Sequence, residues 1–373
     1  MLKNLFSSGK KPENVTHTIE TFLQEYRSQC FPDGVMHALT KVNVLLKKKT
    51  YILELTLPFA CQGELEDIAR ELVTKLDIDI ELSLTLAINP VRSHSIKGIK
   101  NIVAIASGKG GVGKSTTAVN LAYALMAEGA KVGILDADIY GPSIPTMLGI
   151  ENQRPSSIDG KLMQPLSAKG LTAMSIGFLV SDSDATVWRG PMASSAFSQM
   201  LNETAWGNAA GTAEQELDYL IIDMPPGTGD IQLTLAQKVP VAAATIVTTP
   251  QDIALKDAVK GINMFDKVKV PVLGVIENMS YHICDNCGHH SHLFGKGGAQ
   301  TITEQYKVDL LGQLPLNIQI REDSDAGNPI VLANAAGEIT TMYRKIARNM
   351  AAQLYYQLDA KSPYTAEITS LEQ

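Results

Sequence analysis

The chain has 373 residues, of which 45% are hydrophobic, and its formal net charge is −7. This length allows two domains with a sizeable core, and the negative charge provides no general basic surface for nucleic acid. No apolar run of about eighteen residues predicts a transmembrane helix, and the first residues lack the apolar core of a secretory signal. The four cysteines are too few for a disulfide framework. We therefore expect a cytoplasmic protein with reduced thiols that binds neither nucleic acid nor a membrane.

Residues 1–88 are predicted to form a small α+β domain. Apolar residues recur on one face of a helix over 65–76, and apolar and polar residues alternate over 78–88 as in a half-buried strand. Cys30 and Cys61 are isolated, and we expect both to be buried as small hydrophobic residues. Helices are predicted at 18–27 and 65–76, and strands at 41–46, 50–57 and 78–88.

Residues 89–100 contain proline, glycine and polar residues without a clear period, which predicts a linker. A buried strand then leads into a glycine-rich loop in which Gly108, Gly113, Lys114 and Ser115 match the spacing of a phosphate-binding loop. Glycines let successive N–H groups turn around an anion, and the following helix adds its positive end. We expect Lys114 to reach the β- and γ-phosphates of ATP and Ser115 to ligand Mg²⁺. The expected nucleotide-binding residues are Gly108, Lys109, Gly110, Gly111, Val112, Gly113, Lys114, Ser115 and Thr116.

Lys109 is a second lysine within this loop, and it would crowd Lys114 if both pointed at the same phosphates. The loop resembles the deviant Walker A motif of the family that contains the nitrogenase iron protein and the cell-division and plasmid-partition ATPases. The resemblance implies a nucleotide-dependent homodimer in which Lys109 reaches the nucleotide of the partner and acts in catalysis. The alternative is a solvated loop lysine.

Two buried strands end in carboxylates. The strand 131–135 is followed by Asp136 and Asp138, and the strand 218–223 ends at Asp223. Such positions lie on the ligand side of an open α/β sheet. We expect Asp223 to hold Mg²⁺, Asp136 to support the magnesium site, and Asp138 to orient the attacking water during ATP hydrolysis. Alternatively, Asp136 or Asp138 caps the next turn.

Two further residues are candidates for the nucleotide site. Gly227 lies in a Pro/Gly-rich loop after Asp223. We expect its N–H to donate to the γ-phosphate and the loop to move when that phosphate leaves. The alternative is a Pro/Gly turn that does not change conformation with the nucleotide. Asn278 follows the strand 272–277. Its side-chain amide suits hydrogen bonding to the edge of the adenine ring, as in matching families; the alternative is an Asx turn.

Strands alternate with helices through residues 101–360, which predicts an α/β fold of the P-loop NTPase class, with a parallel sheet and helices on both faces. Residues 361–373 are expected to be a flexible tail. Further strands are predicted at 171–176, 241–248 and 308–311, and helices at 118–128, 253–266, 298–306 and 339–356.

Cys284 and Cys287 have the C-x-x-C spacing that lets two thiolates converge on one metal or cluster. Four histidines lie in the same segment, so both cysteines and two histidines would suit a tetrahedral zinc. A redox dithiol is a second possibility, although a thioredoxin-like context is absent. In the third possibility, the cysteine pair is half of a site. A second subunit would supply the other two thiolates, because a [4Fe–4S] cluster needs four.

Several motifs together resemble the Mrp (ApbC-like) family of iron–sulfur cluster carrier ATPases over residues 100–357. The resemblance implies a [4Fe–4S] cluster that bridges two subunits through Cys284 and Cys287, slow ATP hydrolysis, and transfer of the cluster to apo-proteins with assembly factors as partners. Residues 1–88 faintly resemble the small domain of iron–sulfur assembly factors, but the acidic Asp-Pro-Glu signature of that domain is missing. The motifs are those at 136–143, 223–230, 276–280 and 321–329, with the cysteine pair.

Two rival interpretations remain open from the sequence. A partition-type, MinD-like positioning ATPase would need a basic or amphipathic tail, which residues 362–373 do not provide. A zinc-stabilised nucleotide switch without carrier activity would use the cysteines and histidines of the same segment.

Overall fold

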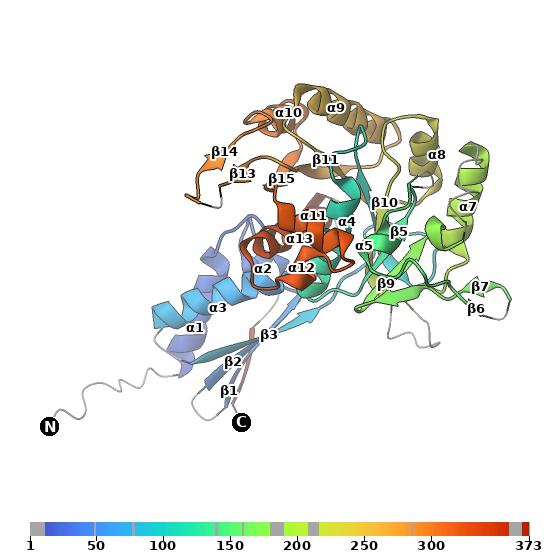
Figure 1. The fold of residues 1–373 in the computed structure, drawn as a ribbon. Helices are drawn as coiled ribbons and strands as arrows, with labels where there is room; N and C mark the ends of the chain where they lie inside the picture. The colour runs from blue at the N-terminus through green and yellow to red at the C-terminus, as the bar shows by residue number, and fades with distance from the viewer. Residues whose placement is uncertain are drawn as a thin grey trace. The chain divides into compact units, whose positions relative to one another are not determined.

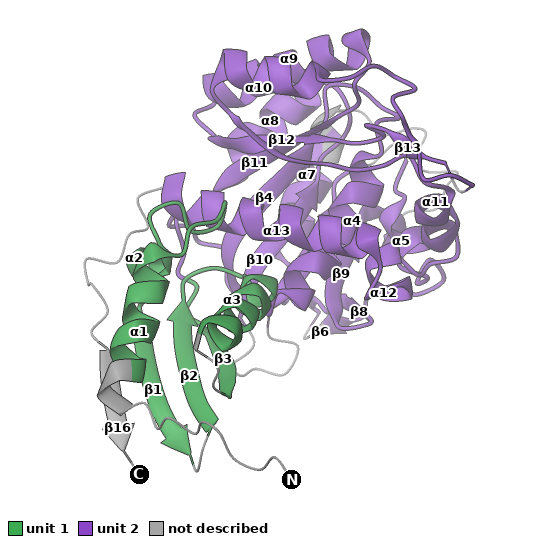
Figure 2. Ribbon diagram, turned by 90° about the vertical axis from the view of Figure 1, so that its left-hand side faces the viewer, with its two compact units in different colours: residues 1–88, 361–373 green, residues 89–360 purple. Residues whose placement is uncertain are grey.

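The computed structural model describes residues 12–47, 50–76, 79–138, 141–158, 160–179, 190–207, 216–284, 286–357 and 368–372. The chain divides into two compact units, residues 1–88 with 361–373, and residues 89–360 (Figure 2). Figure 1 shows the elements of both units in chain order.

The first unit is a four-stranded sheet of order β16-β1-β2-β3 with helices packed on it. Strands β1 and β2 are antiparallel, and β3 runs parallel to β2. Cys30 and Cys61 are buried here outside any disulfide, as the sequence predicted. The elements are α1 (Pro12–Glu25), α2 (Val35–Ala38), β1 (Lys41–Lys47), β2 (Thr50–Leu57), α3 (Gln62–Leu76), β3 (Ile80–Leu86) and β16 (Ile368–Glu372).

The C-terminal segment differs from the flexible tail predicted for 361–373. Residues 368–372 form β16, which pairs in parallel with β1 so that Ile368 lies opposite Val42. A free sheet edge presents unpaired backbone groups, and isoleucine and threonine favour extended structure, so this edge recruits the segment. The rest of the predicted tail lies outside the described residues.

The second unit is built on an eight-stranded sheet of order β15-β12-β11-β4-β10-β5-β9-β8. Every pairing is parallel except that between β8 and β9. The strands are β4 (Ile99–Ala106), β5 (Val132–Asp136), β8 (Leu166–Ala168), β9 (Leu171–Ser175), β10 (Leu217–Asp223), β11 (Ala243–Thr248), β12 (Val272–Glu277) and β15 (Asp309–Gln313).

Helices cover both faces of this sheet, which confirms the predicted α/β class. Helices α4 and α13 pack together on one face, and α8, α9 and α10 lie on the other (Figure 2). Because both faces are covered, central strands such as β10 are buried along their whole length. The helices are α4 (Lys114–Ala127), α5 (Ile144–Met147), η1 (Ile176–Phe178), α7 (Gly190–Asn202), α8 (Asp230–Lys238), α9 (Asp252–Lys267), α10 (Gly298–Tyr306), α11 (Ile318–Asp325), α12 (Ile330–Ala333) and α13 (Glu338–Gln357).

Two short hairpins complete the second unit, β6–β7 and β13–β14. The segment predicted as a linker, 89–100, is tied to the sheet: Asn101 donates to the carbonyl of Asn89 over 3.1 Å and accepts from the Val91 N–H at 2.9 Å. Strand β4 already begins within that segment. The hairpin strands are β6 (Ser157–Ile158), β7 (Leu162–Met163), β13 (His282–Ile283) and β14 (His290–Ser291).

Candidate functional site

The glycine-rich loop connects β4 to α4 and opens at the carboxyl edge of the parallel strands. Gly111 and Gly113 have φ of 81° and 78°, in the left-handed region that favours glycine. A Cβ on Gly113 would lie 2.2 Å from Nδ2 of Asn278, and one on Gly108 would lie 2.0 Å from the carbonyl oxygen of Asp257. The loop therefore requires glycine at these positions, as a phosphate cradle does.

Lys114 is the first residue of α4 and is almost fully buried. Its Nζ forms an ion pair with Oδ1 of Asp223 and lies 3.2 Å from Oγ of Ser115. Oδ2 of the fully buried Asp223 has no hydrogen-bond partner within the described part of the chain. Buried polar atoms are normally paired, so this free oxygen beside a serine hydroxyl fits a magnesium ion or one of its water ligands.

Asp136 lies next to Asp223, because β5 and β10 pair with these two residues opposite each other. Its carboxylate accepts from Oγ of Ser175 at 2.9 Å and from the N–H of Asp138 at 3.1 Å. The turn-capping role that the sequence left open is therefore present. The same contacts hold the end of β5 in place beside the candidate magnesium ligand.

Burial, and after it the charge of Asp223, raises the pKa of Asp136 to about 7. The value in an unfolded chain is about 3.9, so ionised Asp136 lowers folding stability as the pH rises from about 4 to about 7. A carboxylate kept in such a place at a cost in stability is typical of a functional site. A nearby cation, such as the Lys114 ammonium, offsets part of this cost.

Hydrogen bonds from Gly227 and Gln232 help to hold the loop after β10. Gly227 has φ of 101°, and its N–H donates to the carbonyl of Ser107 over 3.0 Å, so in this conformation it is bonded to the start of the phosphate-binding loop. Gln232 of α8, which we did not single out in the sequence, is buried and donates through Nε2 to the carbonyl of Pro225. The only sequence signal was a polar residue in the first turn of a helix that follows a Pro/Gly-rich loop.

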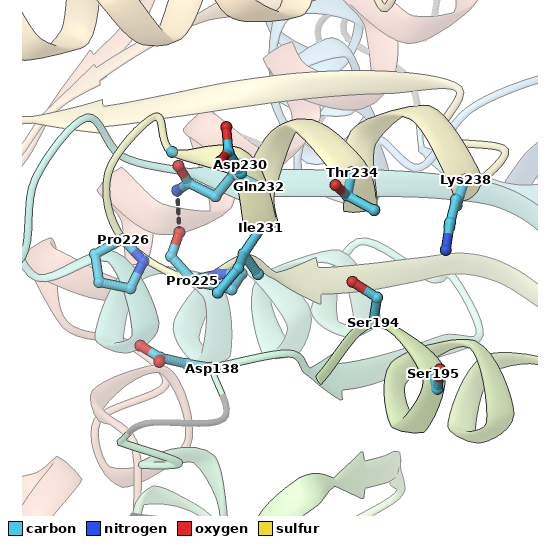
Figure 3. Close-up of a pocket in the computed structure, with 11 residues that line it drawn as sticks. Asp138, Ser194, Ser195, Pro225, Pro226, Asp230, Ile231, Gln232, Thr234 and Lys238 are labelled. Atoms are coloured by element: carbon cyan, nitrogen blue, oxygen red, sulfur yellow. Dashed lines mark hydrogen bonds between the residues drawn. The ribbon is translucent and has the colours of Figure 1, made fainter. Parts of the chain in front are cut away.

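A cavity of about 850 Å³ lies between α7, α8 and this loop (Figure 3). Asp138 lines it, and its carboxylate faces Pro225 and Pro226 in the close-up. The cavity therefore gives the side chain that we expect to orient water an open space next to the loop that contains Gly227. Its other lining residues are Ser194, Ser195, Gly229, Asp230, Ile231, Gln232, Thr234 and Lys238.

Lys109 and Asn278 flank the phosphate-binding loop. The half-exposed Lys109 directs its Nζ to Oε1 of Gln251, 3.5 Å away at the start of α9, whereas Lys114 pairs with the buried Asp223. Asn278 donates from Nδ2 to the carbonyl of Val112 over 2.9 Å. Its side chain thus contacts the phosphate-binding loop itself instead of forming an isolated Asx turn.

The cysteine pair lies on the hairpin β13–β14. Cys284 is half-buried and Cys287 is exposed, and neither belongs to a disulfide. The Cys284 N–H donates to the carbonyl of His289 over 2.9 Å, and Gly288, with φ of 70°, closes the turn by donating to the carbonyl of Cys284 at 2.8 Å. Within the described residues, which omit Asp285, no three His, Cys, Asp or Glu side chains are placed to hold a metal ion. A zinc site with four ligands from one chain therefore has no support in this geometry.

A parallel sheet with a phosphate-binding loop after β4 and a buried acid at the end of β10 defines a P-loop NTPase. Residues 98–351 match the model of the ParA family described as NUBPL iron-transfer P-loop NTPase. The chain belongs to this family, which confirms the resemblance drawn from its motifs.

Relatives named as iron–sulfur cluster carrier or transfer proteins match most of the chain. The iron–sulfur cluster carrier protein of Escherichia coli K12 is 52% identical over 94% of this chain and 95% of its own length. The iron–sulfur cluster transfer protein NUBPL of Dictyostelium discoideum is 46% identical over 71% of this chain and 80% of its own.

Solved structures share the fold of the second unit. A nucleotide-binding protein of Archaeoglobus fulgidus in complex with ADP is 35% identical, with a TM-score of 0.56 over 66% of this chain and 93% of its own. The cell-division ATPase MinD of Pyrococcus furiosus is 20% identical, with a TM-score of 0.50 over 67% of this chain and 98% of its own, and shows the shared fold alone. Among the described helices, none has both the length and the apolar character needed to cross a bilayer.

Proposed function

We propose that this protein is an ATP-dependent carrier that holds a [4Fe–4S] cluster between two identical subunits and passes it to apo-proteins. The observation that carries the proposal is the exposed Cys284–Cys287 hairpin in a chain of the iron-transfer P-loop NTPase family. The Escherichia coli relative that matches almost the whole chain is named as an iron–sulfur cluster carrier. Neither a positioning ATPase nor a zinc-stabilised switch explains an exposed cysteine hairpin around which the described residues place no group of three metal-binding side chains.

The cluster is the cargo of the carrier, and each subunit offers half of its ligands. Two thiolates from one hairpin leave two coordination positions of a four-iron cluster to be filled, and a symmetric partner supplies the same pair. Reduced thiols in the cytoplasm suit this role, because the thiolate is the form that binds iron. The exposure of Cys287 allows an apo-protein to approach the cluster.

ATP would bind in the loop from Gly108 to Thr116. Lys114 would neutralise the β- and γ-phosphates, and Ser115 and Asp223 would hold Mg²⁺, which supplies further charge for the developing transition state. Asp136 supports this end of the sheet through Ser175, and Asp138 would orient the attacking water from the cavity in Figure 3. Gly227 would exchange its bond to Ser107 for the γ-phosphate. We expect slow hydrolysis, coupled to the carriage of the cluster.

The carrier role is tested by transfer to a defined acceptor. Protein reconstituted anaerobically with iron and sulfide should restore the activity of apo-aconitase faster than the same amounts of free iron and sulfide. The measurement is aconitase activity against time, with a chelator present to remove released iron. Restoration no faster than that by free iron and sulfide would contradict the carrier function.

Lys109→Ala is expected to lower ATP hydrolysis by about tenfold or more while ATP still binds, because Lys109 acts on the nucleotide of the other subunit. Mixing this variant with Lys114→Ala should restore part of the activity, since one site of the heterodimer then has an intact Lys114 and the partner subunit's Lys109. Phosphate release is measured before and after mixing. Heterodimers that form without any recovery would show that Lys109 does not act in trans.

A further inference from the structure

The segment 277–284 connects the nucleotide loop to the cysteine pair within a few residues. At one end, Asn278 donates to the carbonyl of Val112, and its amide lies in the space that a Cβ on Gly113 would need. At the other end, Cys284 opens the turn of the hairpin β13–β14. In Figure 1 the hairpin extends from the β15 side of the sheet. Two candidate sites that are otherwise separate therefore share one short stretch of backbone.

A buried carboxylate lies at the centre of this stretch. Glu277 is 1% exposed and ends β12. Its Oε1 accepts from the N–H of Ala299 in the first turn of α10 at 2.9 Å, and its Oε2 accepts from Nε2 of Gln313 at 2.6 Å and from the hydroxyl of Ser280. All three donors are uncharged groups from different parts of the chain. Such a fully bonded carboxylate fixes the elements around it, because each lost bond would leave a buried charge underpaired.

The turn that Glu277 fixes has a strained backbone. Met279 has φ of 56°, in the left-handed region that a residue with a side chain rarely adopts. Such a conformation persists only where the surrounding structure enforces it. Here two hydrogen bonds of Ser280 provide that constraint: its hydroxyl donates to Glu277, and its N–H donates to the carbonyl of Leu314 over 2.9 Å.

Beyond the turn, the hairpin is attached to the same framework. The Leu316 N–H donates to the carbonyl of Tyr281 over 2.7 Å, and the Tyr281 ring stacks on His290 with 4.8 Å between centroids and 7° between planes. The ring nitrogen Nδ1 of His292 lies 3.2 Å from the carbonyl oxygen of Ser280. Strand β14 and the residue directly after it thus contact the residues that directly follow the turn, and β13 continues from them in the chain, so a shift of the turn would move the cysteine loop.

We propose that Glu277 and Ser280 are positioning residues that couple nucleotide binding at the phosphate loop to the position and reactivity of Cys284 and Cys287. A nucleotide that displaces the loop at Val112 and Gly113 changes its contact with Asn278, and the turn held by Glu277 passes the displacement to the hairpin. This inference rests on the proposed function, since the coupling would let the nucleotide state set how firmly the cysteines hold the cluster. Two sites are coupled only if each of them makes contacts that differ between the two conformations of the protein.

The test uses cluster-free protein, so that it does not depend on the carrier function. Alkylation of Cys287 by iodoacetamide is timed by peptide mass spectrometry with and without Mg·ADP, and ADP affinity is measured separately. In the wild type the rate should change by about fivefold or more on nucleotide binding. In Glu277→Gln the ratio of the two rates should fall towards one while ADP still binds, because an amide cannot accept all three hydrogen bonds.

Ser280→Ala provides a second, milder variant, which decides the question if Glu277→Gln does not fold. Asp218→Asn is the matched control: Asp218 is also a buried carboxylate, but it pairs with Lys100 at the opposite end of β10, and the wild-type ratio should persist. The proposal would be overturned if folded Glu277→Gln or Ser280→Ala showed the same ratio of alkylation rates with and without Mg·ADP as the wild type. It would also be overturned if the alkylation rate of the wild type did not depend on nucleotide. Iron content after reconstitution, measured in parallel, reports on the carrier function separately.

Discussion

Lys114→Ala is expected to abolish ATP hydrolysis, with a loss of kcat/KM of about a hundredfold or more. The buried ammonium forms an ion pair with Asp223, and in the nucleotide complex it would neutralise the phosphates at the start of α4. Its removal also leaves Asp136 and Asp223 buried side by side without that positive charge, so thermal stability should fall as well. Phosphate release measures the loss of hydrolysis, the binding of a fluorescent ATP analogue shows whether nucleotide still binds, and a thermal melt measures the loss of stability.

Lys100→Ala is the matched control for this change. Lys100 also pairs with an aspartate of β10, Asp218, but it lies at the other end of β4, away from the phosphate-binding loop. This variant should hydrolyse ATP at close to the wild-type rate. Hydrolysis by Lys114→Ala within a few-fold of the control would mean that the loop from Gly108 to Ser115 is not the catalytic nucleotide site.

Cys284→Ala and Cys287→Ala are each expected to lose the cluster after anaerobic reconstitution. Removing one thiolate from each hairpin takes two of the four ligands from a bridging cluster, and the remaining pair cannot hold it. Iron and sulfide content and the visible thiolate-to-iron absorption are measured after desalting. Cys61→Ala is the control, because this buried thiol in the first unit should leave cluster binding unchanged. A Cys284→Ala dimer that retained its full iron content would contradict the assignment.

The fold of the second unit was predictable because its signals are local. The continuous apolar runs of β4 and β10 mark strands buried on both faces, and the glycine spacing between Gly108 and Gly113 marks the phosphate loop. The helix after this loop begins at Lys114, earlier than the apolar spacing from 118 indicated, because the left-handed Gly113 starts it directly. The family was predictable from the combination of motifs, which the matched family model confirms.

Other features depend on contacts between residues distant in sequence. Glu277 looked like an ordinary strand end, and its role became visible only when Ala299 and Gln313 were placed around it. Strand β16 was missed because its partner β1 lies more than three hundred residues away in the chain. The Gly227 switch was expected from the Pro/Gly-rich loop, but its bond to Ser107 and the nearby Gln232 contact required the packed loop.

The most direct test of the central claim is native mass spectrometry of the protein reconstituted anaerobically with iron and sulfide. The two-hairpin site predicts a dimer that carries about four iron atoms and about four sulfides, with no cluster on the monomer. The same spectrum of Cys284→Ala should show protein without this added mass. A monomer that carries a complete cluster, or a dimer that carries only zinc, would contradict a cluster shared between two cysteine hairpins.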